Sequence, residues 1–498
     1  MEKRLLLVLF FVSLAFASGC AVQDDVELKD DKGSNESVRE SEAKTESIIQ
    51  KVRQILSGRS QTPQLGDLCT GDEECDEYCH SYSFECEEYC RGHPENPTCQ
   101  EHFAFVIEGK ERPSYLDYEG GTPFGVRKEK CNPQFEQFGA SPLKIEDIGQ
   151  IEPLGRMGSD HITPTDHMYL RPPNWGIDTR PRDVIAPGDG HIILIERLNF
   201  QSSADQPVAI DDYRVVIEHS CDIYTFFIHI SELSEKVQDK IGEIRPGDIR
   251  KLRMPVEEAE VIGQIKLLPH LALLKVFQID FSVVDTSAQQ PGFANPKFIY
   301  YRVSEPWKTY IVDPFPYFKE PIRSQLLVKN LRRVEPFGGR IDYDIDGRLV
   351  GNWFLEGTGA DIGGPKEGLD LYWQAHLAVA YDYIDPTQIR FSIGDYVNGV
   401  PGHFGVKGNS PNPAGIGIES GLVKYELVSF EHVSKDTGEV WDGFNYLLNL
   451  IARNREGEVR GVVLFQLLDA RKLKAEVFPN KTAGEVIGFT ENAKVYER

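Results

Sequence analysis

The chain has 498 residues, of which 40% are hydrophobic and 10% aromatic, so it has enough apolar material to bury a sizeable core. A chain of this length is too long to fold around a single hydrophobic core, so two or three domains are expected. The formal net charge is −24, and no cluster of Lys and Arg interrupts this acidic excess. Because a surface that binds phosphates needs local positive charge, we expect no nucleic-acid partner.

The N-terminus has the form of an export signal. Residues 1–4 are short and basic, an apolar run follows, and Ala17-Ser18-Gly19-Cys20 resembles the cleavage box of lipoproteins. We therefore predict that residues 1–20 are a signal peptide and that a lipidated Cys20 anchors the protein to the cell membrane, outside the cytoplasm. The alternative is ordinary cleavage near Ser18, with no role for Cys20. Beyond residue 20 no apolar run is long enough to span a bilayer.

Between the signal and the first domain, residues 21–65 are polar, charged and nearly free of aromatic side chains. Such a segment cannot bury enough apolar surface to offset its chain entropy, so a flexible linker is expected.

Eight cysteines follow the linker. An even number behind an export signal favours disulfides. We predict a small disulfide-rich segment over residues 66–130, with zinc binding as the alternative, and a remaining pair that joins the entry of the next domain to one of its core strands. The predicted disulfide cysteines are Cys69, Cys75, Cys79, Cys86, Cys90, Cys99, Cys131 and Cys221.

Residues 131–300 have the pattern of an antiparallel sheet, with short β-branched runs separated by Gly, Pro and Asp. The turn signal Gly188-Asp189-Gly190 indicates a structural rather than a catalytic role for Asp189. The expected strands are 184–195, 213–218, 224–229 and 276–284.

The order of motifs in this region resembles lysostaphin-type zinc endopeptidases, which cut peptide cross-links in bacterial cell walls. The resemblance rests on Gly158-Ser159-Asp160-His161-Ile162-Thr163-Pro164-Thr165-Asp166-His167, on Val184-Ile185-Ala186-Pro187-Gly188-Asp189-Gly190 and on Tyr224-Thr225-Phe226-Phe227-Ile228-His229-Ile230. It covers about a quarter of the chain. It implies an antiparallel peptidase-like sheet and an open three-ligand zinc site, whose remaining position carries the activated water.

By this resemblance His229 takes the position of the catalytic strand histidine, and His161, Asp166 and Asp280 are the candidate metal ligands. His167, next to Asp166, could replace His161. A second register of the first motif uses Asn174-Trp175-Gly176-Ile177-Asp178. The late His-x-His pair of the family is Gln278-Ile279-Asp280 here, so one catalytic histidine and one ligand histidine are replaced. Because this change removes a metal ligand and a proton carrier together, we favour an inactive cleft. No cofactor is certain, and zinc is the one that the resemblance implies.

Residues 301–498 form a second β-rich region. Regularly spaced strands predict a β-barrel or a sandwich, and Gly351-Asn352-Trp353 resembles the Gly-x-Trp of lipocalin-like barrels. Asp342-Tyr343-Asp344-Ile345-Asp346-Gly347 opens like a calcium loop but has Trp353 where a bidentate Glu is needed, so a hairpin is favoured. The predicted strands are 340–344, 349–355, 373–381, 388–393, 421–430, 446–452, 461–468 and 472–478.

The sequence therefore predicts a mainly β, exported protein with a peptidase-like sheet domain and a C-terminal β domain. The function that we favour is binding or scaffolding of a cell-envelope component or surface peptide. The alternatives are a divergent zinc metallopeptidase and a C-terminal barrel that captures a small ligand.

Overall fold

The structure, a computed structural model, describes residues 123–124, 131–173, 180–198, 211–266, 277–288, 290–299, 305–358 and 372–498. The chain divides into two compact units, Met1–His93 and Pro94–Arg498, and the described residues all belong to the second. The predictions for Cys20, for the linker and for the six cysteines from Cys69 to Cys99 lie outside the described residues. Within the described ranges, no helix is long and apolar enough to cross a membrane.

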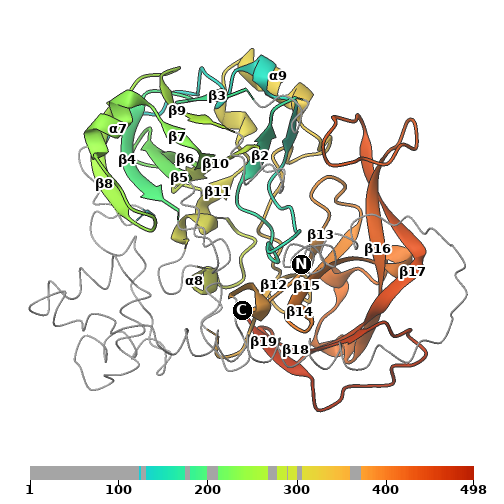
Figure 1. The fold of residues 1–498 in the computed structure, drawn as a ribbon. Coiled ribbons are helices and arrows are strands. Elements are labelled where there is room, and N and C mark those ends of the chain that lie inside the picture. The colour runs from blue at the N-terminus through green and yellow to red at the C-terminus, as the bar shows by residue number, and fades with distance from the viewer. Residues whose placement is uncertain are drawn as a thin grey trace, which may run out of the picture. The chain divides into compact units, whose positions relative to one another are not determined.

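An antiparallel sheet forms the first part of this unit (Figure 1), in the order β1-β2-β10-β6-β5-β4-β8, and β11 also pairs with β10. A smaller sheet has the order β3-β9-β7. The strands are β1 (Gln150–Glu152), β2 (Met168–Arg171), β3 (Arg182–Ile185), β4 (Gly190–Arg197), β5 (Tyr213–Glu218), β6 (Ile223–Ile230), β7 (Glu232–Leu233), β8 (Ile249–Val256), β9 (Val261–Ile265), β10 (Ile279–Asp285) and β11 (Ile311–Val312).

The central strands β6 and β10 are buried along almost their whole length, as expected for strands with neighbours on both sides and packing on both faces. Three α-helices in the described part are α7 (Glu235–Ile241), α8 (Pro296–Ile299) and α9 (Ile322–Lys329). Short 3₁₀ turns also occur, among them η2 (Pro306–Tyr310). The core of the sheets includes side chains well beyond residue 300, such as Phe315, Leu326 and Ile341.

The single strand expected over 184–195 is wrong, because a turn divides it into β3 and β4. Asp189 holds this turn, since its carboxylate accepts a hydrogen bond of 2.7 Å from the backbone N–H of Glu258. A Cβ at Gly190 would lie only 2.4 Å from the carbonyl oxygen of Glu218, so this position needs glycine. Asp189 is thus structural.

The disulfide expected between Cys131 and Cys221 is present, with 5.0 Å between the two Cα atoms. It joins residues 90 positions apart in the sequence. Next to it the backbone N–H of Cys221 donates to the carbonyl of Asn132, at 2.8 Å. The bond therefore fastens the segment that enters the sheet to the turn between β5 and β6.

The C-terminal region is a closed antiparallel barrel in which each strand pairs with the next and β19 closes onto β12 (Figure 1). The prediction of a barrel or sandwich is therefore confirmed as a barrel, with the up-and-down order of lipocalin-like proteins. Its strands are β12 (Gly351–Leu355), β13 (His376–Tyr381), β14 (Ile389–Val397), β15 (Val400–Val406), β16 (Val423–Ser434), β17 (Leu450–Leu467), β18 (Lys472–Pro479) and β19 (Lys494–Glu497).

Aromatic side chains fill the inside of the barrel. The Phe391 ring lies edge-on to Tyr425 and to Phe465, with centroids 4.9 and 5.5 Å apart. Trp353 of the Gly-x-Trp tripeptide is completely buried on β12. This packing does not favour ligand capture inside the barrel, the third function that the sequence suggested.

The strand expected at 340–344 is wrong, and neither aspartate in it is placed as a calcium ligand. Asp342 accepts a hydrogen bond of 2.9 Å from the N–H of Gly292, and Asp344 accepts one of 2.7 Å from the N–H of Asn352. These carboxylates hold backbone from the connecting segment and from the barrel, which gives this stretch a structural role.

Candidate functional site

Three polar side chains meet where three strands of the larger sheet lie side by side. His167 directly precedes β2, His229 lies in β6, and Asp280 lies in β10 between these two strands. Asp280 Oδ2 is 3.1 Å from His167 Nε2 and 3.4 Å from His229 Nε2. One carboxylate oxygen thus contacts the outer nitrogens of two imidazoles.

A β-bulge aims His229 into this group. The pairing of β5 with β6 shifts register, since Tyr213 lies opposite Ile230 whereas Val215 lies opposite Phe227. His229 has a φ of 74°, a left-handed conformation that is costly for a residue with a Cβ. Bulges of this kind re-aim side chains and occur often beside functional sites.

Two further carboxylates orient the imidazoles from behind. Asp166 Oδ1 is 2.8 Å from His167 Nδ1, and Asp212 Oδ2 is 2.7 Å from His229 Nδ1. Because an ionised carboxylate only accepts, Nδ1 is the donor in each pair and Nε2 points toward Asp280. We call Asp166, His167, Asp212, His229 and Asp280 the His–Asp cluster.

Neighbouring donors hold the carboxylates of the cluster. The indole N–H of Trp307 donates to Asp166 Oδ2 at 3.0 Å, and the amide of Gln278 donates to Asp280 Oδ1 at 2.9 Å. The hydroxyl of Ser282 also donates to the backbone carbonyl of Asp166. The side chains of His167 and Asp280 are only 6% and 4% exposed, whereas that of His229 is 22% exposed and is the part of this trio nearest to solvent.

Burial and the charges of the cluster oppose each other in setting its pKa values. Burial alone would lower the pKa of His167, but Asp280 and Asp166 outweigh it and raise that pKa. The pKa of His229 is raised well above its ordinary value for the same reason, by Asp280 and Asp212 against burial. Burial would raise the pKa of Asp280, but the two histidines hold it below its usual range.

His161 lies beside the cluster in a tight loop. Its ring centroid is 5.6 Å from that of His167, and the loop is closed by paired backbone hydrogen bonds between Gly158 and His161. Nε2 of His403, from barrel strand β15, donates to the carbonyl of Ser159 in this loop at 3.0 Å. Burial and the neighbouring His167 lower the pKa of His161 to about 4.

The residues predicted from the sequence thus lie close to one another, but each has a different position relative to the His–Asp cluster. Asp280 and His229 face each other, Asp166 lies behind His167, and His161 lies to one side of His167. The alternative register over 174–178 is outside the described residues. Among the residues that the structure describes, no group of three or more His, Cys, Asp or Glu side chains is already spaced to hold a metal ion.

Sequence reasoning missed Asp212 and Trp307. Asp212 belongs to none of the motifs that carry the resemblance, and the pairing of β5 with β6 brings it to His229. Trp307 is even further along the chain, in η2. A signal for Asp212 did exist, namely an aspartate directly before a predicted strand whose neighbour carries the histidine.

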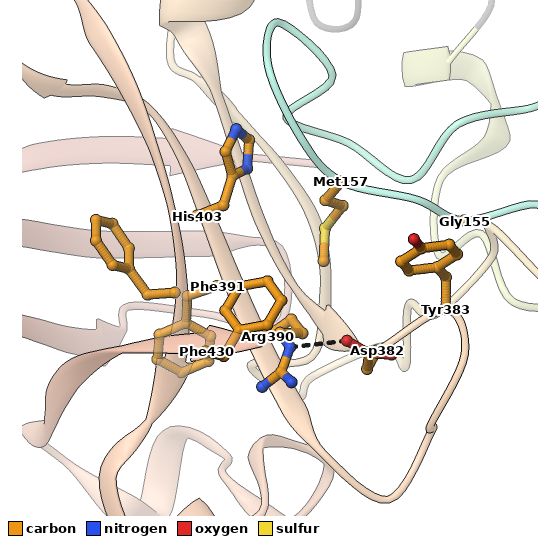
Figure 2. A pocket seen from close by; sticks show the side chains of 9 residues that line it. Gly155, Met157, Asp382, Tyr383, Arg390, Phe391, His403 and Phe430 are labelled. Carbon is orange, nitrogen blue, oxygen red and sulfur yellow. Dashed lines mark hydrogen bonds and ion pairs between the residues drawn. The ribbon is translucent and has the colours of Figure 1, made fainter. Parts of the chain in front are cut away.

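A small concave feature lies at the rim of the barrel. Figure 2 shows it between barrel side chains, including Phe391 and His403, and the segment of Gly155 and Met157. Its volume is about 20 Å³, which is room for about one water molecule. Arg390 and Asp382 in its wall form an ion pair of 2.9 Å.

Comparison with known proteins gives only low similarities. No protein-family model matches the chain, and no curated protein matches it. A structure of the SpoIIQ–SpoIIIAH pore-forming complex matches at 14% identity and a TM-score of 0.22, over 38% of this chain and 96% of that chain. A zinc-containing peptidase from Vibrio cholerae matches at 16% identity and a TM-score of 0.18, over 30% of this chain and 38% of the peptidase. The solution structure of lysostaphin matches at 8% identity and a TM-score of 0.20, over 73% and 92%. Similarities this low show no family membership.

Proposed function

We propose that this protein is an exported, lipid-anchored component of the cell envelope that binds a cell-wall or surface peptide without cutting it. The binding part is the sheet domain around the His–Asp cluster, which we take to be a non-hydrolytic relative of the lysostaphin-type peptidases. The export and the anchor rest on residues 1–20 of the sequence, with Cys20 as the lipidated residue.

The observation that carries the proposal is the pair formed by Asp280 on β10 and Gln278, which directly precedes that strand. The resemblance requires histidines at both positions, one to bind zinc and one to carry a proton. Gln278 is neutral and uses its amide to hold Asp280 at 2.9 Å, so it cannot exchange a proton with a substrate. A site that keeps its oriented histidines but lacks this proton carrier favours binding over hydrolysis.

Retention on insoluble peptidoglycan tests the binding. The mature protein should sediment with purified peptidoglycan, and His229→Trp, which places a large ring at the most exposed member of the trio, should reduce retention by about tenfold. Glu458→Gln, at an exposed position of β17, is the matched control and should bind as the wild type does. Equal retention of the His229→Trp protein, with its thermal unfolding unchanged, would contradict binding at this cleft.

The anchor has its own test in cells. Wild-type protein should incorporate labelled fatty acid and fractionate with membranes, whereas Cys20→Ala should do neither. Membrane fractionation of the Cys20→Ala protein at the wild-type level would refute the lipid anchor while leaving the peptide-binding proposal intact.

A divergent zinc metallopeptidase is the second candidate, and one observation favours it. Two imidazoles with carboxylates on Nδ1 converge on a third carboxylate, which is the arrangement in which histidines are oriented for metal. In that case His229 or a bound water would act as the base. Release of new amino groups from peptidoglycan distinguishes the two candidates.

A further inference from the structure

We propose that Arg156 binds a carboxylate group of the peptide and thereby determines which peptides the site beside the His–Asp cluster accepts. Arg156 is in the loop between β1 and β2, the same loop that carries His161. No motif in the sequence pointed to this arginine. The inference rests on the proposed binding of a peptide, to which it adds the chemical class of the group that is recognised.

Arg156 lies over the same face of the sheet as the His–Asp cluster. Tyr169 of β2 is directly opposite Glu152 of β1 on one side and Asp280 of β10 on the other. Directly opposite residues of antiparallel strands point to the same face, so these three side chains form a row. The guanidinium carbon of Arg156 is 5.3 Å from the centroid of the Tyr169 ring, and the ring centroid of His167 is 5.0 Å from it. The arginine and the cluster thus contact one aromatic ring.

The positive charge of Arg156 has no carboxylate of its own. Its one ion pair among the described residues is with Glu152, where Nη1 and Oε2 are 3.6 Å apart, too far for a hydrogen bond. Glu152 is already held by Arg171, at 2.5 Å, and by the hydroxyl of Tyr383, which donates to Oε2 at 3.2 Å. Two guanidinium groups therefore share one carboxylate. A ligand carboxylate, with its single negative charge, would balance the second.

The side chain of Arg156 can be reached from solvent. It is 35% exposed, whereas the side chain of its partner Glu152 is 2% exposed. The other open position is His229, at 22%, on the far side of β10. Two strand spacings separate the positions, or about 10 Å, which an extended peptide of about three residues spans. A peptide bound at His229 can therefore place a carboxylate at Arg156.

The loop fixes Arg156 in place before any ligand binds. The backbone N–H of Gly155 donates to the carbonyl of Thr165 at 2.9 Å, and that of Thr165 donates to the carbonyl of Arg156 at 3.1 Å. On the barrel side, Nε2 of His403 donates to the carbonyl of Ser159 at 3.0 Å. A side chain on a fixed loop loses less entropy on binding, and the planar fork of a guanidinium matches the two oxygens of a carboxylate.

Amidation of the ligand tests the role of Arg156. Purified peptidoglycan is compared with the same material after its free carboxylates are converted to methylamides. Amidation should lower retention of the wild-type protein by about tenfold, because one charge-assisted hydrogen bond is lost. Arg156→Gln should bind the untreated material about tenfold less than the wild type does, and amidation should make no further difference to it. Arg156→Lys should keep part of the affinity, because it retains the charge but not the fork.

Arg245→Gln is the matched control, since the side chain of Arg245 is 84% exposed, and it should behave as the wild type does on both materials. Two results would overturn the inference. One is equal retention of the wild type and Arg156→Gln on untreated peptidoglycan. The other is an amidation effect of the same size in the wild type and in Arg156→Gln.

A small carboxylate separates this inference from the proposed function. Titration of the full-length wild-type protein with N-acetylalanine should shift the Nε–Hε NMR signal of Arg156, which is assigned by its absence from Arg156→Gln, and N-acetylalaninamide should not shift it. If the wild type is not retained on peptidoglycan, the proposed function fails, while a shift with N-acetylalanine alone still supports the carboxylate site. No shift, or an equal shift with both compounds, would overturn the inference.

Discussion

Asp212 and His229 are joined across neighbouring strands, with Asp212 Oδ2 2.7 Å from His229 Nδ1. This contact links the start of β5 to the bulge in β6, so the strand pairing itself delivers the carboxylate to the ring. It fixes the orientation of the ring and points Nε2 at Asp280.

Replacing Asp212 should lower the pKa of His229. In Asp212→Ala we expect a pH titration followed by ¹⁵N NMR to give His229 a lower pKa than in the wild type, because one of the two carboxylates that raise it is gone. The matched control is Asp211→Ala, since Asp211 is 54% exposed and pairs with Arg197 instead. The same His229 pKa in both variants would mean that Asp212 does not stabilise the charged ring.

Arg498 should be critical for the stability of the barrel. Its guanidinium carbon lies 4.0 Å from the centroid of the buried Trp353 ring, and its nitrogens donate to the carbonyls of Val350, Ile345 and Arg348 at 2.6–2.7 Å. Arg498→Ala removes these three hydrogen bonds and the contact with the Trp353 ring, and should lower the free energy of unfolding by about 3 kcal/mol or more.

Chemical denaturation measures this loss. Arg460→Ala removes an exposed arginine of β17 and should stay within about 0.5 kcal/mol of the wild type. Arg498→Lys should recover only part of the stability, because an ammonium cannot match the planar fork of the guanidinium. Equal stability of Arg498→Ala and Arg460→Ala would refute the role of Arg498.

His219 should make the protein less stable in acid. Burial, the largest cause, lowers its folded-state pKa to about 4, while in the unfolded chain it titrates near its ordinary value of about 6.5. Its contribution to stability is therefore present above pH ~6.5 and is lost as the pH falls toward about 4, by up to about 3 kcal/mol.

His219→Gln removes this titration. The stability difference between wild type and His219→Gln should be largest at neutral pH and should shrink between pH ~6.5 and ~4, as measured by denaturant unfolding at several pH values. A difference that stays constant over this range would show that His219 is not held neutral by the fold.

The bond between Cys131 and Cys221 should stabilise the sheet. It closes a loop of 90 positions, for which the chain-entropy model gives about 4.6 kcal/mol. We expect Cys131→Ala/Cys221→Ala to lose about this much unfolding free energy, measured in denaturant. If the double variant has the same unfolding free energy as the wild type with the bond intact, other contacts hold this segment in place.

Local patterns in the sequence were enough to predict much of the fold. The strand expected at 213–218 is β5 residue for residue, and the aromatic strand that ends near His229 is β6. The barrel followed from regularly spaced strands, but the strands expected at 446–452 and 461–468 are the single strand β17, and β15 and β19 were missed. β15 contains Pro401 and two glycines, and β19 is only four residues long, so both lack a strong strand signal.

The sequence was enough to locate the site, but it did not show which role each residue of the site has. Asp166 and His167 are adjacent, and only the pairing of β2 with β10 decides which of them faces Asp280. Asp212 reaches His229 through the register of two other strands. A shift of one residue in a strand moves a side chain to the opposite face, so roles that depend on register are not contained in a motif.

The most direct measurement of the central claim, a site that binds peptide without cutting it, is the release of new amino groups from peptidoglycan by the protein in the presence of added Zn²⁺. We predict no release above the level of the His229→Ala variant, together with retention of the wild-type protein on the same material. Sustained release by the wild type that His229→Ala abolishes would contradict this account and identify the protein as a peptidase.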